Sequence, residues 1–148
     1  VISGLAIKHG PAHLFRAVIE GVAYGTEDIF ATMCKAGYRP LEFVMCGGAT
    51  RSDLWMQIHA DVSGVPIQLT KVPDAPSLGS AILAAVGSGA YSSIPEACDA
   101  MVEFARTIHP DMDSHEKYKP LLEAYRNTYL HLKDTLHRQA AIGKGVSD

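Results

Sequence analysis

One segment near the middle of the chain, residues 42–70, constrains the fold most strongly, because it shows the order strand, turn, helix, strand. The apolar run Phe43–Cys46 is typical of a short buried strand, and the two glycines after it predict a turn. Ser52 is a good N-cap for a helix that Gly64 ends, and Val65–Thr70 is typical of a second strand. Two strands joined by a helix predict a βαβ unit with parallel strands and a right-handed crossover.

Helices are predicted on both sides of this unit. Gly10-Pro11 can open a helix, and apolar residues recur at helical spacing from residue 12 to about 36. The remainder, residues 77–141, is expected to be helical, in segments at 77–86, from Ser93 to about Phe104, and at 114–141. Residues from Gly143 onward are expected to fray. The pattern therefore predicts an α/β fold with a short parallel βαβ core flanked by helices.

Composition and charge indicate a cytoplasmic protein that binds neither nucleic acid nor a membrane. The 148 residues carry a formal net charge of -3, which gives no basic field for a nucleic acid or an anionic surface. The longest apolar stretches, such as Ala81–Val86, are far shorter than the roughly 20 residues of a membrane helix. The 3 cysteines form no C-x-x-C pair, so we expect reduced thiols rather than a zinc or redox motif.

The turn after the first strand is the part of the sequence with a chemical role. Glycines allow positive φ and let a ligand approach the backbone, and the start of a capped helix favours negative charge. Ligands of open α/β sheets bind where the strands end, and this turn lies there. Residues 47–53 are therefore predicted to lie near an anionic or nucleotide ligand, with a simple tight turn as the alternative. Neither a Walker A loop nor a G-x-G-x-x-G fingerprint is present.

Three segments, in order, resemble those of the FGGY family of carbohydrate kinases. His13–Tyr24 is similar to the family's R-A-x-x-E-G-[IV]-A-[YF] helix. Gly47–Pro66 resembles its adenosine-binding segment, in which glycines precede a Trp-x-Gln helix that ends in D-x-x-G-x-P. Ala75–Gly89 matches a third segment at the expected distance. These matches span about Gly4 to Tyr91, and the trailing helices also fit the end of the family.

The resemblance implies an actin-like, ribonuclease-H-like kinase of two domains with ATP between them. Residues 1–148 would be its C-terminal nucleotide-binding part, and the N-terminal sugar-binding domain would be absent. That domain would carry the catalytic carboxylate, so no catalytic residue is assigned here, and the chain alone is expected to be inactive. Mg²⁺ would be held mainly by the nucleotide and the absent domain. The implied reaction is ATP-dependent phosphorylation of a small sugar, most simply a ketopentose such as xylulose or ribulose.

Carried over by position, five residues would form the nucleotide site. Gly47, Gly48 and Ala49 would pass the adenosine and the α-phosphate. Arg51 would neighbour a phosphate or the ribose, with an exposed surface arginine as the alternative. Ser52 stands where some members carry an asparagine that contacts adenine, and it could instead serve only as a helix cap.

Other polar and aromatic residues near these motifs have simpler interpretations. Asp53 is expected to be a first-turn carboxylate, Trp55 a core residue and His59 a packed or half-exposed histidine. Asp74 precedes the third motif, and either anchors a turn beside the nucleotide or has no such role.

Four residues of the first helical region are assigned ordinary polar roles. His9 and His13 have the spacing of metal ligands but lack an accompanying glutamate, and Glu20 is expected to pair with Arg16.

Three tyrosines of the last predicted helix, Tyr118, Tyr125 and Tyr129, have helical spacing and are expected to form a packing face.

Two rival classes keep the fold without this reaction. One is a non-catalytic actin-like nucleotide-binding or interaction module, and the other is a different actin-like ATPase, such as an acetate-type or sugar-sensing kinase. In either case the two short strands would normally join a larger sheet, which leaves a free strand edge and an apolar face. We therefore expect a homo-oligomer, with pairing of the free edges as its simplest form.

Overall fold

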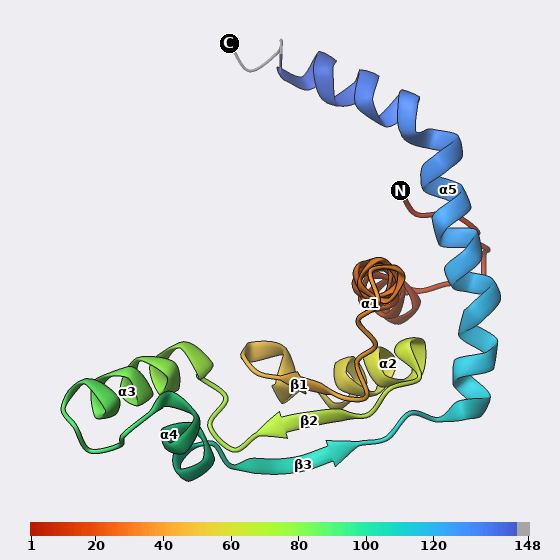
Figure 1. Cartoon of the computed structure of the whole chain (residues 1–148). Coiled ribbons are helices and arrows are strands. Elements are labelled where there is room, and N and C mark those ends of the chain that lie inside the picture. The colour runs from red at the N-terminus through yellow and green to blue at the C-terminus, as the bar shows by residue number, and fades with distance from the viewer. Residues whose placement is uncertain (145–148) are drawn as a thin grey trace.

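The structure is a computed structural model that describes residues 1–144, so most of the end expected to fray lies outside the described residues. Its elements, labelled in Figure 1, are α1 (Pro11–Lys35), β1 (Phe43–Met45), the 3-10 turn η1 (Gly48–Arg51), α2 (Asp53–Ser63), β2 (Ile67–Thr70), α3 (Ala75–Gly87), α4 (Ile94–Met101), β3 (Phe104–Ile108) and α5 (Met112–Lys144).

The unit from β1 through α2 to β2 has the expected parallel arrangement. Phe43 pairs with Ile67, and the register continues to Met45. Ser52 caps α2, where its hydroxyl oxygen accepts a hydrogen bond from the N–H of Trp55 at 3.2 Å. The helix ends at Gly64, whose φ of 69° lies in the left-handed region.

A third strand, β3, corrects the prediction that residues up to about Phe104 are helical. Helix α4 ends at Met101, and Val102 already has extended dihedrals, φ -93° and ψ 114°. β3 then pairs antiparallel with β2, so the three strands form a mixed sheet in the order β1-β2-β3. Pairing with β2 decides this conformation, because the alternating residues of Phe104–Ile108 gain a hydrogen-bonded neighbour that only the folded sheet supplies. One edge expected to be free is thus covered, and the outer edge of β1 remains.

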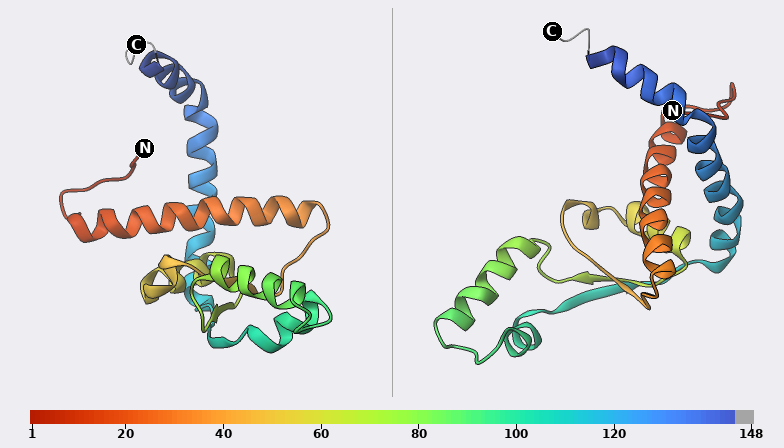
Figure 2. Two further views of the ribbon diagram at one scale, coloured as in Figure 1. Left: turned by 90° about the vertical axis from the view of Figure 1, so that its left-hand side faces the viewer. Right: turned by 45° about the horizontal axis from the view of Figure 1, so that its top comes forward.

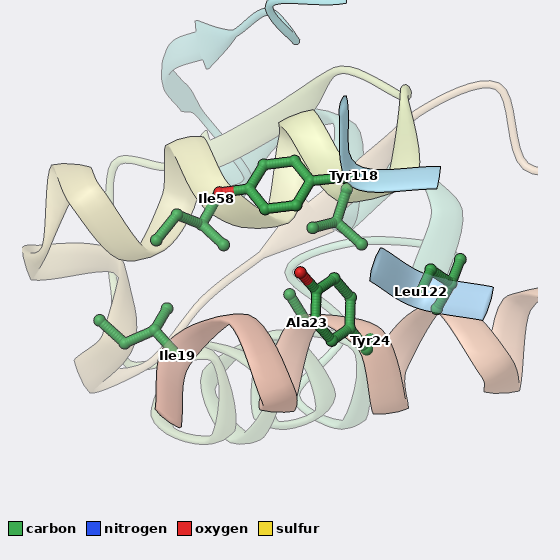
Figure 3. Close-up of a cluster of buried hydrophobic side chains, with 7 residues drawn as sticks. Ile19, Ala23, Tyr24, Ile58, Tyr118 and Leu122 are labelled. Atoms are coloured by element: carbon green, nitrogen blue, oxygen red, sulfur yellow. The ribbon is translucent and has the colours of Figure 1, made fainter. Parts of the chain in front are cut away.

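Two layers of apolar side chains hold α2 in the middle of the fold. One layer, drawn in Figure 3, joins α1, α2 and the start of α5 and consists of Ile19, Ala23, Tyr24, Ile58, Val62, Tyr118 and Leu122. The other lies between α2 and the sheet and consists of Met56, Ala60, Ile67 and Leu69. Trp55 packs against both layers, which confirms its expected place in the core.

A polar tie between α1 and α5 supports the first layer. Arg16 and Glu20 form the expected ion pair, with Nε and Oε1 2.8 Å apart. The hydroxyl of Tyr118 donates to Glu20 Oε1 at 3.0 Å and accepts from Arg16 Nη2 at 2.9 Å. Tyr118 is thus packed as expected, while Tyr125 and Tyr129 on the same helix remain 40% and 50% exposed.

The remaining helices extend away from this core. α3 and α4 pack on each other, with Ile82 of α3 and Ala97 of α4 buried, and together they project from one end of the sheet (Figure 1). The helix α5 continues through Pro120 and reaches beyond α1, as both views in Figure 2 show. Within the described residues, no helix combines the length and apolar character needed to cross a membrane.

Candidate functional site

The site predicted from the sequence lies where the two parallel strands end. The turn after β1 and the turn before α3 meet at this edge of the sheet, because the N–H of Gly47 donates to the carbonyl oxygen of Pro73 at 2.8 Å. This hydrogen bond joins the glycine motif to the turn that leads into the third motif, between residues that are about 25 positions apart in the sequence. We call the surface formed by Gly47–Ser52 the glycine ledge.

The conformation of the ledge depends on Gly47. Its φ of 91° lies in the region that side chains disfavour, so glycine is required there for the backbone alone. Its carbonyl oxygen accepts two hydrogen bonds from Thr50, one from the N–H at 3.2 Å and one from the hydroxyl at 2.7 Å. These bonds fold the chain into the single 3-10 turn that leads to α2.

Gly48 and Ala49 form the open part of the ledge. Both are exposed, and a side chain added at Gly48 would meet no protein atom within 4 Å. Among the hydrogen bonds of the described residues, none uses the N–H of Gly48 or Ala49. The fold itself therefore does not require glycine at position 48, and the turn presents bare backbone donors to the solvent.

Charged residues flank the ledge on its α2 side. Asp53, in the first turn of α2, forms an ion pair with Arg106 of β3. The ion pairs of the described residues leave Arg51 out, and its side chain is exposed. Asp53 is thus a first-turn carboxylate, as expected, and Arg51 is an exposed cation within the ledge.

Asp74 fixes the second turn of the site. It caps α3, where its carboxylate accepts hydrogen bonds from the hydroxyl of Ser77 at 2.7 Å and from the N–H of Ser77 at 3.2 Å. These two bonds hold the pKa of Asp74 below its ordinary value. Asp74 therefore anchors this turn, and Pro73 beside it receives the hydrogen bond from Gly47.

Comparison with known proteins decides the family. The family model described as the C-terminal domain of the FGGY family of carbohydrate kinases matches residues 1–88, which include α1, the glycine ledge and α3. This chain belongs to the FGGY family. The family model ends before α4, β3 and α5.

Curated relatives of this FGGY chain include several sugar kinases. The xylulose kinase of Bacillus subtilis is 30% identical over 131 residues, which are 88% of this chain and 26% of the relative. The autoinducer-2 kinase of Escherichia coli K12 is 36% identical over 123 residues, which are 82% of this chain and 23% of the relative. The FGGY chain therefore spans about a quarter of the length of the curated relatives it matches.

Solved structures of the family have the same fold. The crystal structure of xylulose kinase from Rhodospirillum rubrum superposes with a TM-score of 0.80 and 33% identity, covering 93% of this chain and 28% of the other. Gluconate kinase from Lactobacillus acidophilus gives a TM-score of 0.78 at 24% identity, which supports the fold alone. The α/β architecture, with its small mixed sheet, is therefore part of an FGGY kinase fold.

Three histidines near the family motifs, His9, His13 and His59, make hydrogen bonds within the chain. His59 is 6% exposed and stacks on Trp55, and its Nδ1 lies 3.0 Å from the carbonyl oxygen of Trp55. Burial lowers the pKa of His59 below its ordinary value, with the backbone hydrogen bond acting in the opposite direction. His9 and His13 accept hydrogen bonds from the N–H groups of Ala6 and Gly10, which is the ordinary polar role expected.

Sequence reasoning missed two parts of the site. Arg106 was not predicted, because residues 77–141 were expected to be helical and the segment Phe104–Ile108 has no apolar–polar alternation that would indicate a strand. The bond from Gly47 to Pro73 had no sequence signal, because it depends on how two turns meet in space. Arg51 and Ser52 are adjacent: Arg51 ends the 3-10 turn η1, and Ser52 is the N-cap of α2.

Proposed function

We propose that this chain forms the adenosine-binding side of an ATP-dependent kinase that phosphorylates a hydroxyl of a small sugar. The observation that carries the proposal is the hydrogen bond from Gly47 to Pro73, which holds the glycine motif against the turn before the third family motif, where the parallel strands end. The unpaired backbone donors and open space of Gly48 and Ala49 add a surface on which a planar nucleoside can lie.

Each residue of the glycine ledge has a proposed role. The backbone at Gly47, Gly48 and Ala49 passes the adenosine and the α-phosphate, and the absence of side chains at the glycines permits close approach. Arg51 lies beside the phosphates or the ribose, where its guanidinium offers charged donors. Ser52 keeps its hydroxyl oxygen on the α2 cap, so any contact with adenine uses the hydroxyl hydrogen.

The proposed Mg²⁺ is coordinated by ATP and not by side chains of this chain. Among the described residues, no group of three or more metal-binding side chains comes together. The carboxylates nearest the ledge, Asp53 and Asp74, are engaged by Arg106 and Ser77. We therefore assign them to holding the turns in place and leave the ion to the phosphate oxygens and to the remainder of the enzyme.

Catalysis by such a kinase comes from positioning and electrostatic stabilisation of the phosphoryl group in transfer. The share of this chain is to hold the adenosine end while the domains close on the substrates. Because the chain spans about a quarter of its relatives, the sugar site and the catalytic carboxylate are proposed to lie in a separate N-terminal domain. The chain alone is expected to release no ADP.

Xylulose or ribulose is the proposed sugar, in a cytoplasmic homo-oligomer. Two of the relatives described above are named xylulose kinases, which favours xylulose over ribulose. The other names, autoinducer-2 kinase and gluconate kinase, belong to proteins that share the fold and act on different molecules.

Titration of the isotopically labelled 148-residue chain with ATP tests the ledge by NMR. Millimolar ATP is expected to shift the backbone amides of residues 47–53 and 73–77, and Gly48→Leu is expected to abolish these shifts by filling the open space. Gly87→Leu, at the far end of α3 and equally free of protein neighbours, serves as the matched control. Shifts confined to other parts of the chain, or shifts unchanged in Gly48→Leu, would contradict the proposed site.

A chimaera tests the function of the whole enzyme. In it, this chain replaces the matching 26% of the Bacillus subtilis xylulose kinase. ADP release with xylulose is expected from the chimaera and not from the same chimaera carrying Gly48→Leu. A soluble, folded chimaera that binds xylulose but never releases ADP would favour the non-catalytic module.

A further inference from the structure

Arg106 of β3 lies at the same edge of the sheet as the glycine ledge. Met45 of β1 is opposite Leu69 of β2, and Leu69 is opposite Arg106, so the three residues form one row across the sheet. Met45 is the last residue of β1, two positions before Gly47. Residues opposite each other in a sheet project to the same face, and Leu69 packs in the apolar layer against α2. Arg106 therefore projects toward the helix that follows the ledge.

The partner of Arg106 on that helix is Asp53. Nη2 of Arg106 and Oδ1 of Asp53 form an ion pair, which joins β3 to the first turn of α2. Asp53 directly follows Ser52, the last residue of the ledge. A 3-10 turn advances about 2 Å per residue, so Asp53 lies roughly 10 Å from Ala49, comparable to the Debye length of about 8 Å at physiological ionic strength. Asp53 is thus the carboxylate next to the surface proposed for the α-phosphate.

Without a cation beside it, the carboxylate of Asp53 would oppose an anionic ligand on the ledge. The start of a helix attracts negative charge, so this carboxylate and the phosphates of a nucleotide would compete for the same region. Two negative charges at this separation repel each other unless a cation compensates one of them. The pair with Arg106 compensates the charge of Asp53 and directs its carboxylate toward β3.

Folding stability alone does not account for the pair. The side chains of Arg106 and Asp53 are 50% and 79% exposed, and an ion pair so exposed adds little to stability because water and salt screen it. The same compensation recurs nearby, where Lys71 after β2 pairs with Glu103 before β3, with Nζ and Oε2 2.7 Å apart. The larger effect of the pair between Arg106 and Asp53 is therefore on the charge that the edge presents to a ligand.

We propose that Arg106 is a positioning residue of the nucleotide site, which acts through Asp53 and keeps the phosphates of ATP from meeting an uncompensated carboxylate. This inference rests on the proposed adenosine-binding role of the glycine ledge. It concerns the affinity for the anionic part of the nucleotide, so the uncharged nucleoside binds independently of Arg106.

NMR titration of the labelled 148-residue chain with ATP and with adenosine, followed at the amides of residues 47–53, tests the role of Arg106. In about 10 mM salt, Arg106→Gln is expected to weaken ATP binding about threefold or more and to leave adenosine binding unchanged. Adding Asp53→Asn to Arg106→Gln is expected to restore the affinity for ATP, because no uncompensated carboxylate remains. At about 1 M salt, where the Debye length is about 3 Å, the difference between parent and Arg106→Gln is expected to disappear.

Lys119→Gln is the matched control. Lys119 belongs to a similarly exposed ion pair, with Glu116 of α5, and the substitution changes the net charge by the same amount. It is expected to leave the affinity for ATP unchanged. Circular dichroism verifies that each variant keeps its helix content. If Arg106→Gln unfolds, Asp53→Asn alone replaces it, and this variant is expected to bind ATP about threefold more tightly, since Arg106 is then free to attract the phosphates.

Two results would overturn this inference and leave the proposed function intact. The first is an equal affinity for ATP in the parent and in Arg106→Gln. The second is an equal loss for ATP and adenosine that Asp53→Asn does not restore, which would assign Arg106 a purely structural role. An absence of ATP-induced shifts at residues 47–53 in the parent chain would instead contradict the proposed nucleotide site, and the role of Arg106 with it.

Discussion

Gly64 shows how a single residue can be constrained twice. Its positive φ strains any other residue, and an added side chain would lie 2.7 Å from Cε1 of His115. That ring cannot move freely, because its Nδ1 lies 2.8 Å from the carbonyl oxygen of Asp61. Gly64 of the D-x-x-G motif thus allows α5 to begin against the end of α2, which is a structural role within a segment first noticed for its nucleotide chemistry.

Gly64→Ala is expected to lower the free energy of unfolding by about 2–3 kcal/mol, from left-handed strain together with displacement of His115. Urea denaturation measures the change. Gly37→Ala is the matched control, because Gly37 has a φ of 92° but an added side chain would meet no atom within 4 Å. It is expected to cost about 1 kcal/mol from strain alone. Equal losses in the two variants would show that the contact with His115 carries no cost.

His59 is expected to make the stability depend on pH. Because burial lowers its pKa in the folded state, the unfolded chain takes up a proton first as the pH falls below about 6.5. His59 therefore costs no stability above that pH, where it is neutral in both states. The free energy of unfolding falls as the pH drops from the unfolded pKa to the lowered folded pKa. The loss is about 1.4 kcal/mol for each unit by which the two pKa values differ.

His59→Gln is expected to flatten the fall in unfolding free energy between pH 7 and pH 5, measured by urea denaturation at each pH. Exposed His137→Gln is the control and should leave the slope as it is. Glu27, whose pKa burial raises, acts in the opposite direction, so the difference between variant and parent isolates His59. An unchanged slope in His59→Gln would refute this assignment.

At the scale of elements, the start of α5 is held to α1 by a side-chain hydroxyl as well as by apolar packing. Tyr118→Phe removes the group that contacts both Arg16 and Glu20 but keeps the ring in the core. The variant is expected to lose about 1–2 kcal/mol of unfolding free energy, since both partners are charged. Thermal denaturation measures the loss. Tyr129→Phe, at a half-exposed ring, is the control and is expected to leave the stability unchanged. An equal loss in Tyr129→Phe would contradict the stabilising role of the Tyr118 hydroxyl.

The whole molecule buries less surface than its length allows. Relative to an unfolded area of about 23,000 Å², folding of a compact chain of this mass would bury about a fifth more than this one does. The urea m-value of the monomer is therefore expected to be about a fifth below that of a compact domain of 148 residues. Denaturation at a concentration where sedimentation shows monomer measures it. An m-value typical of a compact domain would mean that the exposed faces close on each other in solution.

Local signals in the sequence are strong where backbone geometry dictates the residue. Gly64 and Ser52 mark the two ends of α2, and Pro11 marks the start of α1, because caps and first turns have specific chemical requirements. The apolar spacing of α1 and the run at β1 also predict their elements, since each must bury one face. The family motifs follow the same logic, and their order was sufficient to indicate the FGGY fold.

Only the tertiary structure decided how these elements meet. Phe104–Ile108 is a strand because it pairs with the edge of β2. The segment is short and its residues have mixed propensities, so its sequence does not reveal this pairing. The bond from Gly47 to Pro73, the ion pair of Asp53 with Arg106 and the contact of His115 with Gly64 join residues distant in the chain. The sequence by itself thus determined the local elements and the position of the ledge, because these depend on near neighbours. Long-range contacts depend on the packing of the whole chain, so only the three-dimensional structure could supply them.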